Sequence, residues 1–126
     1  MTILLVDDNA RFRKLLCRVL AGLKPPIERV VECGDGETGV ALFRRLHPDW
    51  VLMDLQLPGI SGLEASRRIL QSDPHGNVLI VTQYDEPAYR EEARVTGARG
   101  YLLKEDLADL PGIILRDVQP DEHRDS

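Results

Sequence analysis

Five short apolar runs alternate along this chain with segments of helical periodicity. Three of the runs are apolar at every position, which is expected of strands covered by helices on both faces. Strands that alternate with helices in this way predict a parallel sheet of βα units joined by right-handed crossovers. We therefore expect an α/β fold, a doubly wound parallel sheet. The expected strands are residues 2–7, 29–34, 50–54, 77–82 and 100–103.

Polar residues of particular kinds follow four of these strands. Carboxylates lie at the ends of the first and third strands, a hydroxyl ends the fourth and an ammonium follows the fifth: Asp7 and Asp8, Asp54, Thr82 and Lys104. The carboxyl ends of parallel strands meet at one edge of the sheet, where such folds bind their ligands. We therefore expect these side chains to share one pocket.

The three carboxylates predict a site for a divalent cation. In a sheet of order 2-1-3-4-5 the first and third strands are neighbours, so Asp7, Asp8 and Asp54 lie close together. Two such charges about 4 Å apart repel by roughly 4 kcal/mol at an effective dielectric near 20. Either one carboxyl keeps its proton or a cation lies among them. Oxygen ligands without Cys or His favour Mg²⁺, with Mn²⁺ as a substitute. The alternative is three unconnected acids that cap turns.

A carboxylate beside Mg²⁺, a hydroxyl and an ammonium is suited to accepting a phosphoryl group. Asp54 would attack as the nucleophile, while Mg²⁺ and Lys104 neutralise charge on the transferring oxygens. Thr82 could then hydrogen-bond a phosphoryl oxygen. The product, a mixed anhydride, is labile in water and therefore suits a transient signal.

Composition excludes several other classes of protein. The chain has 126 residues and a net charge of −5, which argues against direct nucleic-acid or membrane binding. No apolar run approaches the length of a membrane span, so we expect a cytoplasmic protein. The two cysteines, Cys17 and Cys33, show no metal-binding spacing and are expected to be partly buried thiols.

The segment between the first two strands predicts an amphipathic helix with Asn9 as its N-cap. Its apolar stripe comprises Phe12, Leu15, Leu16, Val19, Leu20 and Leu23. The opposite face carries Arg11, Lys14 and Arg18. These cations are either a solvated surface or a docking surface for an acidic partner.

Two later helices are expected to be weakly anchored or short. Residues 86–96 offer only Tyr89 and Val95 as large apolar side chains, so this helix is either free to shift or simply a small surface helix. The last helix is expected to begin near Pro111, because Pro111-Gly112 interrupts its apolar pattern. Residues 119–126 are polar and are expected to be a disordered tail or the start of a linker.

Taken together, four segments resemble the receiver domain of two-component response regulators over about residues 2–118. They are Leu4–Asp8, Val51–Gly59, Val81–Thr82 and Gly100–Lys104. The resemblance implies a flavodoxin-like (βα)5 fold of strand order 2-1-3-4-5, with residues 1–118 as the receiver domain. The run Gly-Tyr-Leu-Leu-Lys-Glu resembles the subgroup whose full chains carry a C-terminal helix-turn-helix domain.

The resemblance also implies roles for individual residues. Asp54 would be the phospho-acceptor, and Asp7, Asp8 and the backbone carbonyl of Gln56 would complete the Mg²⁺ site. Thr82 and Tyr101 correspond to the family's coupled switch pair, and Lys104 would pair with the phosphoryl group. Such a domain catalyses its own phosphorylation and slow dephosphorylation.

Partners follow from the same resemblance. A sensor histidine kinase or phosphotransfer domain would dock near the basic face of the first helix. The fourth helix, fifth strand and fifth helix would form the output face. A phosphorylation-dependent dimer is an open alternative. The short fifth helix argues against a dimer that forms through this output face.

Two further departures from the family pattern concern the site. Glu105 follows Lys104 where many receivers have proline. Gln83 follows Thr82 where small residues are common, and its larger side chain could narrow access to Asp54.

Two other functions are alternatives to a phosphorylated signalling module. An aspartyl phosphohydrolase of the haloacid-dehalogenase type would need an acid where this chain has Gln56. A receiver-like interaction domain that never cycles phosphate usually lacks one of the acidic or lysine residues kept here.

Overall fold

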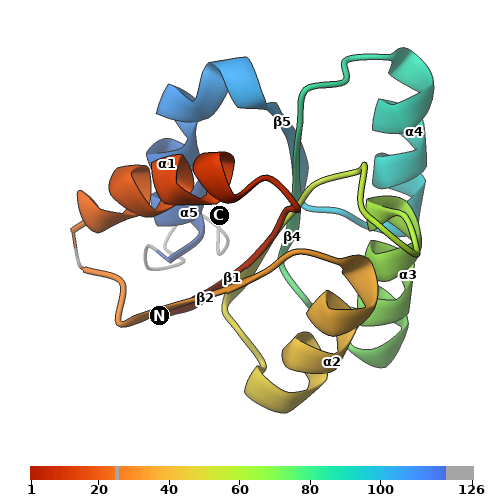
Figure 1. The fold of residues 1–126 in the computed structure, drawn as a ribbon, viewed down its shortest axis with the longest axis horizontal. Coiled ribbons are helices and arrows are strands. Elements are labelled where there is room, and N and C mark those ends of the chain that lie inside the picture. Colours follow the sequence, from red (N-terminus) through yellow and green to blue (C-terminus); the bar gives the residue numbers. More distant parts are fainter. Residues whose placement is uncertain (25, 119–126) are drawn as a thin grey trace, which may run out of the picture.

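The computed structural model describes residues 1–24 and 26–118, and within them a five-stranded sheet lies between two layers of helices (Figure 1). The strands are parallel and follow the order β2-β1-β3-β4-β5. The predicted fold and strand order are confirmed. The elements are β1 (Thr2–Val6), α1 (Ala10–Ala21), β2 (Arg29–Cys33), α2 (Gly36–Leu46), β3 (Trp50–Met53), α3 (Gly62–Ser72), β4 (Val78–Thr82), α4 (Pro87–Thr96), β5 (Gly100–Leu103), the 3-10 helix η1 (Lys104–Asp109) and α5 (Leu110–Val118).

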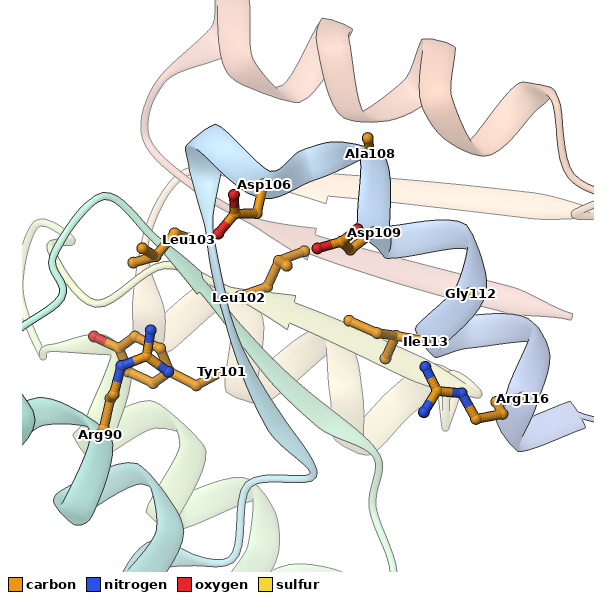
Figure 2. A pocket seen from close by; sticks show the side chains of 10 residues that line it. All are labelled: Arg90, Tyr101, Leu102, Leu103, Asp106, Ala108, Asp109, Gly112, Ile113 and Arg116. Carbon is orange, nitrogen blue, oxygen red and sulfur yellow. The ribbon is translucent and has the colours of Figure 1, made fainter.

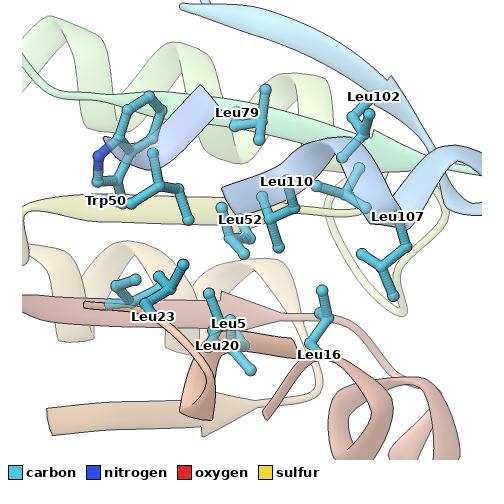
Figure 3. Close-up of a cluster of buried hydrophobic side chains, with 13 residues drawn as sticks. Leu5, Leu16, Leu20, Leu23, Trp50, Leu52, Leu79, Leu102, Leu107 and Leu110 are labelled. Carbon is cyan, nitrogen blue, oxygen red and sulfur yellow. The ribbon is translucent and has the colours of Figure 1, made fainter. Parts of the chain in front are cut away.

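Two hydrophobic cores lie on opposite faces of the sheet, because successive strand residues point to opposite sides. In β1, Ile3 and Leu5 join the core beneath α1, η1 and α5, whereas Leu4 and Val6 join the core beneath α2, α3 and α4. Figure 3 shows the first of these cores, which is rich in leucine. Each fully buried aliphatic side chain contributes roughly 1.5–3 kcal/mol, so both layers hold the sheet firmly.

Helix α1 begins and packs largely as its sequence predicts. The side chain of Asn9 accepts a hydrogen bond from the backbone N–H of Phe12, and Leu16 and Leu20 are buried. The prediction that Leu15 belongs to the inward stripe is wrong, because its side chain is 45% exposed. At about 100° per residue, Leu15 lies roughly 90° from the centre of the stripe. The helix ends at Ala21, and Gly22 is its C-cap residue.

Helix α4 is sparsely anchored, as predicted. Of its residues, all of which the structure describes, Ala93 alone is buried, and Val95 is 69% exposed. The N-cap residue, Glu86, makes no side-chain capping bond. Little apolar surface would therefore be exposed if this helix moved.

The chain between β5 and α5 forms an element that the sequence did not predict. Residues Lys104–Asp109 form η1, and Leu107 within it is buried. Helix α5 then begins at Leu110, one residue before the expected start, with Pro111 in its first turn. The expected tail, residues 119–126, lies outside the described residues.

Within residues 1–24 and 26–118, no helix is long and apolar enough to cross a membrane. The thiols of Cys17 and Cys33 are partly buried and free, as expected.

Candidate functional site

Asp7 and Asp54 leave neighbouring strands side by side. Val6 pairs with Met53, and the N–H of Asp54 donates to the carbonyl of Val6 over 3.0 Å, which continues the parallel ladder to the edge of the sheet. Carboxylate oxygens of Asp7, Asp8 and Asp54 all lie within 4.8 Å of one another. Asp7 and Asp54 are buried, whereas Asp8 is exposed. Three carboxylates at this spacing, open to solvent on one side, fit a hard divalent cation.

Local backbone contacts fix both buried carboxylates. Oδ1 of Asp7 accepts a hydrogen bond of 2.8 Å from the N–H of Asn9, and the carbonyl of Asp7 accepts one from Arg13. Oδ1 of Asp54 accepts a bond of 2.8 Å from the N–H of Leu55. Each carboxylate therefore keeps its second oxygen, Oδ2, for other partners.

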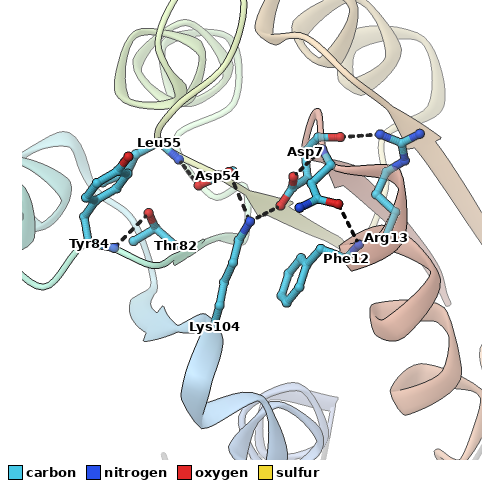
Figure 4. Close-up of polar contacts among 9 residues, drawn as sticks. Asp7, Phe12, Arg13, Asp54, Leu55, Thr82, Tyr84 and Lys104 are labelled. Atoms are coloured by element: carbon cyan, nitrogen blue, oxygen red, sulfur yellow. Dashed lines mark hydrogen bonds and ion pairs between the residues drawn. The ribbon is translucent and has the colours of Figure 1, made fainter.

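Lys104 connects these two carboxylates (Figure 4). Its Nζ lies 2.8 Å from Oδ2 of Asp7 and 3.3 Å from Oδ2 of Asp54. Burial acts to lower the pKa of Lys104, but the hydrogen bond to Asp7 and the charges of both carboxylates outweigh it, so the pKa is raised. The ammonium is therefore held in its charged form between the two acids.

Burial raises the pKa of Asp54 above its ordinary value. Lys104 opposes this shift, whereas the charge of Asp7 adds to it. Asp54 therefore binds a proton more readily than a free aspartate does, and a nearby cation favours its ionised form. A site that needs Asp54 as a nucleophile consequently needs the positive charges around it.

Thr82 and Tyr101 are linked through the backbone of Tyr84. The buried hydroxyl of Thr82 accepts a hydrogen bond of 3.4 Å from the N–H of Tyr84. The hydroxyl of Tyr101 donates a bond of 2.6 Å to the carbonyl of the same residue. Figure 4 shows Thr82 at the sheet edge that also carries Asp54. A change at Thr82 can therefore reach Tyr101 through a single residue.

Arg90 connects α4 to this link. Its guanidinium carbon lies 4.6 Å from the centroid of the Tyr101 ring, and its Nη2 is 2.7 Å from Oδ1 of Asp85. Arg90 and Tyr101 line a groove of about 500 Å³ between α4, β5, η1 and α5, together with Asp106, Asp109, Ile113 and Arg116 (Figure 2). The groove carries charges of both signs beside the ring of Tyr101.

We expect Arg90→Met to raise the pKa of Tyr101 further. Burial already raises this pKa, and the positive charge of Arg90 partly offsets it, so removing the charge leaves burial less opposed. The lost cation–π contact should also cost about 0.5–1 kcal/mol of stability. Ultraviolet titration in a background with Tyr84→Phe and Tyr89→Phe reports Tyr101 alone. Arg94→Met is the control, because Arg94 pairs with Glu91 on the same helix; an equal shift there would contradict the expectation.

The structure brings most of the predicted site residues to one edge. Asp7, Asp8, Asp54 and Lys104 form one cluster, and Thr82 ends the neighbouring strand. The side chain of Gln56 is exposed, and the role of its carbonyl stays a prediction. Sequence reasoning missed the connections made by Tyr84 and Arg90. Neither follows a motif, because each depends on the folded distance between separate elements.

Comparison with known proteins gives the family. The family model for the response regulator receiver domain matches residues 3–114. This chain is a receiver domain of the two-component response regulators. Its sequence is 40% identical over 107 residues to the transcriptional regulatory protein DegU of Brevibacillus brevis, covering 85% of this chain and 45% of that protein. It is 39% identical over 102 residues to the response regulator GacA of Pseudomonas aeruginosa, covering 81% and 47%.

A solved structure supports the same assignment for the receiver. A two-component response regulator of the LuxR family from Aurantimonas has a TM-score of 0.84 and 38% identity, over 92% of this chain and 83% of that one. The resemblance to regulators with an output domain is confirmed by these relatives. The receiver spans about half the length of the curated relatives it matches.

Proposed function

We propose that this receiver accepts a phosphoryl group on Asp54 and relays the change to the face formed by α4, β5 and α5. The observation that carries the proposal is the position of the Asp54 carboxylate. It is buried, lies beside the ammonium of Lys104 and shares one cluster with the carboxylates of Asp7 and Asp8. An acid so surrounded by compensating groups is a reactive group rather than a structural one.

A divalent cation fits this cluster. Asp7, Asp8 and Asp54 offer only oxygen ligands, and the backbone carbonyl of Gln56 would add another, a donor set that favours Mg²⁺ and accepts Mn²⁺. When bound, Mg²⁺ would neutralise negative charge on the transferring oxygens.

The chain's own residues would carry out the transfer. An oxygen of Asp54 attacks phosphorus while the bond from phosphorus to the donor's imidazole nitrogen breaks, and the released imidazole takes up a proton. Lys104 is placed to neutralise a phosphoryl oxygen, and the hydroxyl of Thr82 is placed to donate to one once the group is attached. The aspartyl phosphate is a mixed anhydride, so water can later return Asp54 to its carboxylate.

Thr82 would then pass the change to the output face. If its hydroxyl moves toward a phosphoryl oxygen, the 3.4 Å hydrogen bond that it accepts from the N–H of Tyr84 would change, and Tyr84 would shift with it. Tyr84 holds the hydroxyl of Tyr101, so the ring and the α4 residue above it, Arg90, would respond. The small buried surface of α4 supports a movement of this helix.

The partners are proposed from surface chemistry and the family. A histidine kinase or phosphotransfer domain would dock over α1, where Arg11, Lys14 and Arg18 are exposed. We propose that residues 1–118 act as the receiver unit and, like the named regulators, serve an output domain that controls transcription. The groove beside Tyr101 is the proposed contact for that domain.

We expect one phosphoryl group to be added when the protein is incubated with Mg²⁺ and a phosphohistidine donor or a small acyl phosphate. Borohydride reduction converts an aspartyl phosphate to homoserine, so mass spectrometry of the peptides should place homoserine at position 54. A chelator should prevent labelling, since Mg²⁺ is needed to neutralise the transferring oxygens. Homoserine at any other position, or labelling that survives the chelator, would contradict the proposal.

A further inference from the structure

Phe12 lies in the first turn of α1, close to the ammonium of Lys104. The centroid of its ring is 4.2 Å from Nζ, a distance at which a cation is attracted to the face of an aromatic ring. Figure 4 shows the ring on the α1 side of Lys104, with the two carboxylates beyond the ammonium. The lysine is therefore bounded by two acids and one aromatic ring.

The position of Phe12 follows from the helical stripe that it begins. Leu16 and Leu20, one and two turns further along, are fully buried in the core beneath α1. Phe12 is only partly buried, and its ring faces a cation at the end of that core. The N–H of Phe12 donates to Oδ1 of Asn9, the N-cap residue, and this bond fixes the backbone at this turn. The ring also packs against the core beneath α1, so Lys104 is not its sole contact.

Lys104 needs such a support because its side chain is long and rotatable. A lysine side chain is among those that lose the most rotamer freedom when they become ordered. The two carboxylates attract the ammonium, but they also attract any metal ion bound beside them. The neutral ring of Phe12 attracts the ammonium and does not compete with it for the acids.

We propose that Phe12 is a positioning residue for Lys104: its ring holds the ammonium at the mouth of the carboxylate cluster, where a phosphoryl oxygen arrives. The inference rests on the proposed function only in that Lys104 acts during transfer. The contact between ring and ammonium is independent of that function and can be measured separately.

A double-mutant cycle of stability tests the contact. Phe12→Leu keeps apolar volume but removes the ring, and Lys104→Met keeps the stem but removes the charge. In a chelating buffer, urea unfolding should show a coupling of roughly three- to thirtyfold in the unfolding equilibrium constant between the two substitutions. Phe43→Leu is the matched control, because Phe43 is a buried phenylalanine on α2 in the opposite core, and it should be additive with Lys104→Met. Additivity for Phe12 as well would overturn the proposal.

Phosphorylation by a small acyl phosphate tests the consequence at the site without any partner protein. Phe12→Leu should slow the maximal rate severalfold and leave the Mg²⁺ affinity, measured by calorimetry, unchanged. Phe12→Trp, which restores an aromatic face, should recover most of the rate. In the Lys104→Met background, Phe12→Leu should have no further effect. An equal slowing there, or a parallel loss of Mg²⁺ affinity, would mean that Phe12 acts on the fold and not through Lys104.

The two failures are distinguishable. If the unsubstituted protein gains no phosphoryl group, the proposed function fails, and the stability cycle still decides whether Phe12 holds Lys104. If the unsubstituted protein is phosphorylated and Phe12→Leu is phosphorylated equally fast, the proposed function stands and the positioning role fails.

Discussion

Asp54→Asn should abolish phosphorylation, lowering labelling by at least about 100-fold in the presence of Mg²⁺. The substitution keeps the shape of the side chain but replaces a carboxylate by an amide, whose oxygen is a far weaker nucleophile. Wild type and variant are compared by intact-mass spectrometry after the same exposure to a donor. Asp49→Asn is the control. Asp49 precedes β3, whereas Asp54 follows it, and the carboxylate of Asp49 accepts a hydrogen bond from the N–H of Thr2. Equal labelling of wild type and Asp54→Asn would remove the assignment of the acceptor.

The same variant should be more stable than wild type in a chelating buffer at neutral pH, by about 1 kcal/mol, because asparagine removes a negative charge that is buried and lies beside the charge of Asp7. The raised pKa of Asp54 fixes the pH dependence. A group whose pKa is raised on folding contributes stability at acid pH, and that contribution is lost as the pH rises through the folded-state value. Asparagine does not titrate, so the advantage of Asp54→Asn should grow from acid to neutral pH. An advantage that shrinks over this range, measured by urea unfolding, would contradict the proposed cause.

Gly62→Ala should be strongly destabilising, by about 3 kcal/mol or more, and should displace Asp54. A Cβ at position 62 would lie 1.8 Å from the carbonyl oxygen of Asp54 and 2.9 Å from Cα of Leu55. These are backbone atoms, so rotation of a side chain cannot relieve the overlap. The N–H of Gly62 also donates to the carbonyl of Leu55 over 2.9 Å, and separation of the two segments would lengthen that bond. Urea unfolding and the phosphorylation rate should both report the loss.

Gly112→Ala is the matched control for this change. Gly112 lies in α5, and a Cβ there would meet nothing within 4 Å. Alanine should therefore stabilise the helix by about 0.5–1 kcal/mol through its higher helix propensity and the lower entropy of the unfolded chain. Similar effects of the two substitutions would show that the close approach of α3 to the Asp54 loop does not constrain the site.

The sheet and its reactive edge could be predicted because both depend on local patterns. Apolar runs define buried strands whatever the details of packing, and parallel strands necessarily bring their carboxyl ends together. Asp7, Asp54 and Lys104 could therefore be placed in one pocket before their distances were known. The N-cap at Asn9 was predictable for the same reason, since it depends on the chain within one turn.

Features that depend on packing between elements could not be predicted. The stripe on α1 has the right period, but its margin is set by how closely neighbouring elements cover it, and Leu15 falls outside that cover. The 3-10 turn at Lys104–Asp109 arises where the chain leaves β5 and must bury Leu107 before α5 begins. The bond from Tyr101 to Tyr84 joins a side chain to a backbone carbonyl, and sequence patterns do not identify backbone acceptors.

The separation of the helices into two layers has a consequence for the simultaneous binding of two partner proteins. Helix α1 and helix α4 lie on opposite faces of the sheet (Figure 1). A donor protein resting over Arg11, Lys14 and Arg18 would leave α4 uncovered. Phosphoryl transfer and target binding therefore need not be sequential. A target could already be bound at α4 when the phosphoryl group is transferred, so that donor, receiver and target form one ternary complex.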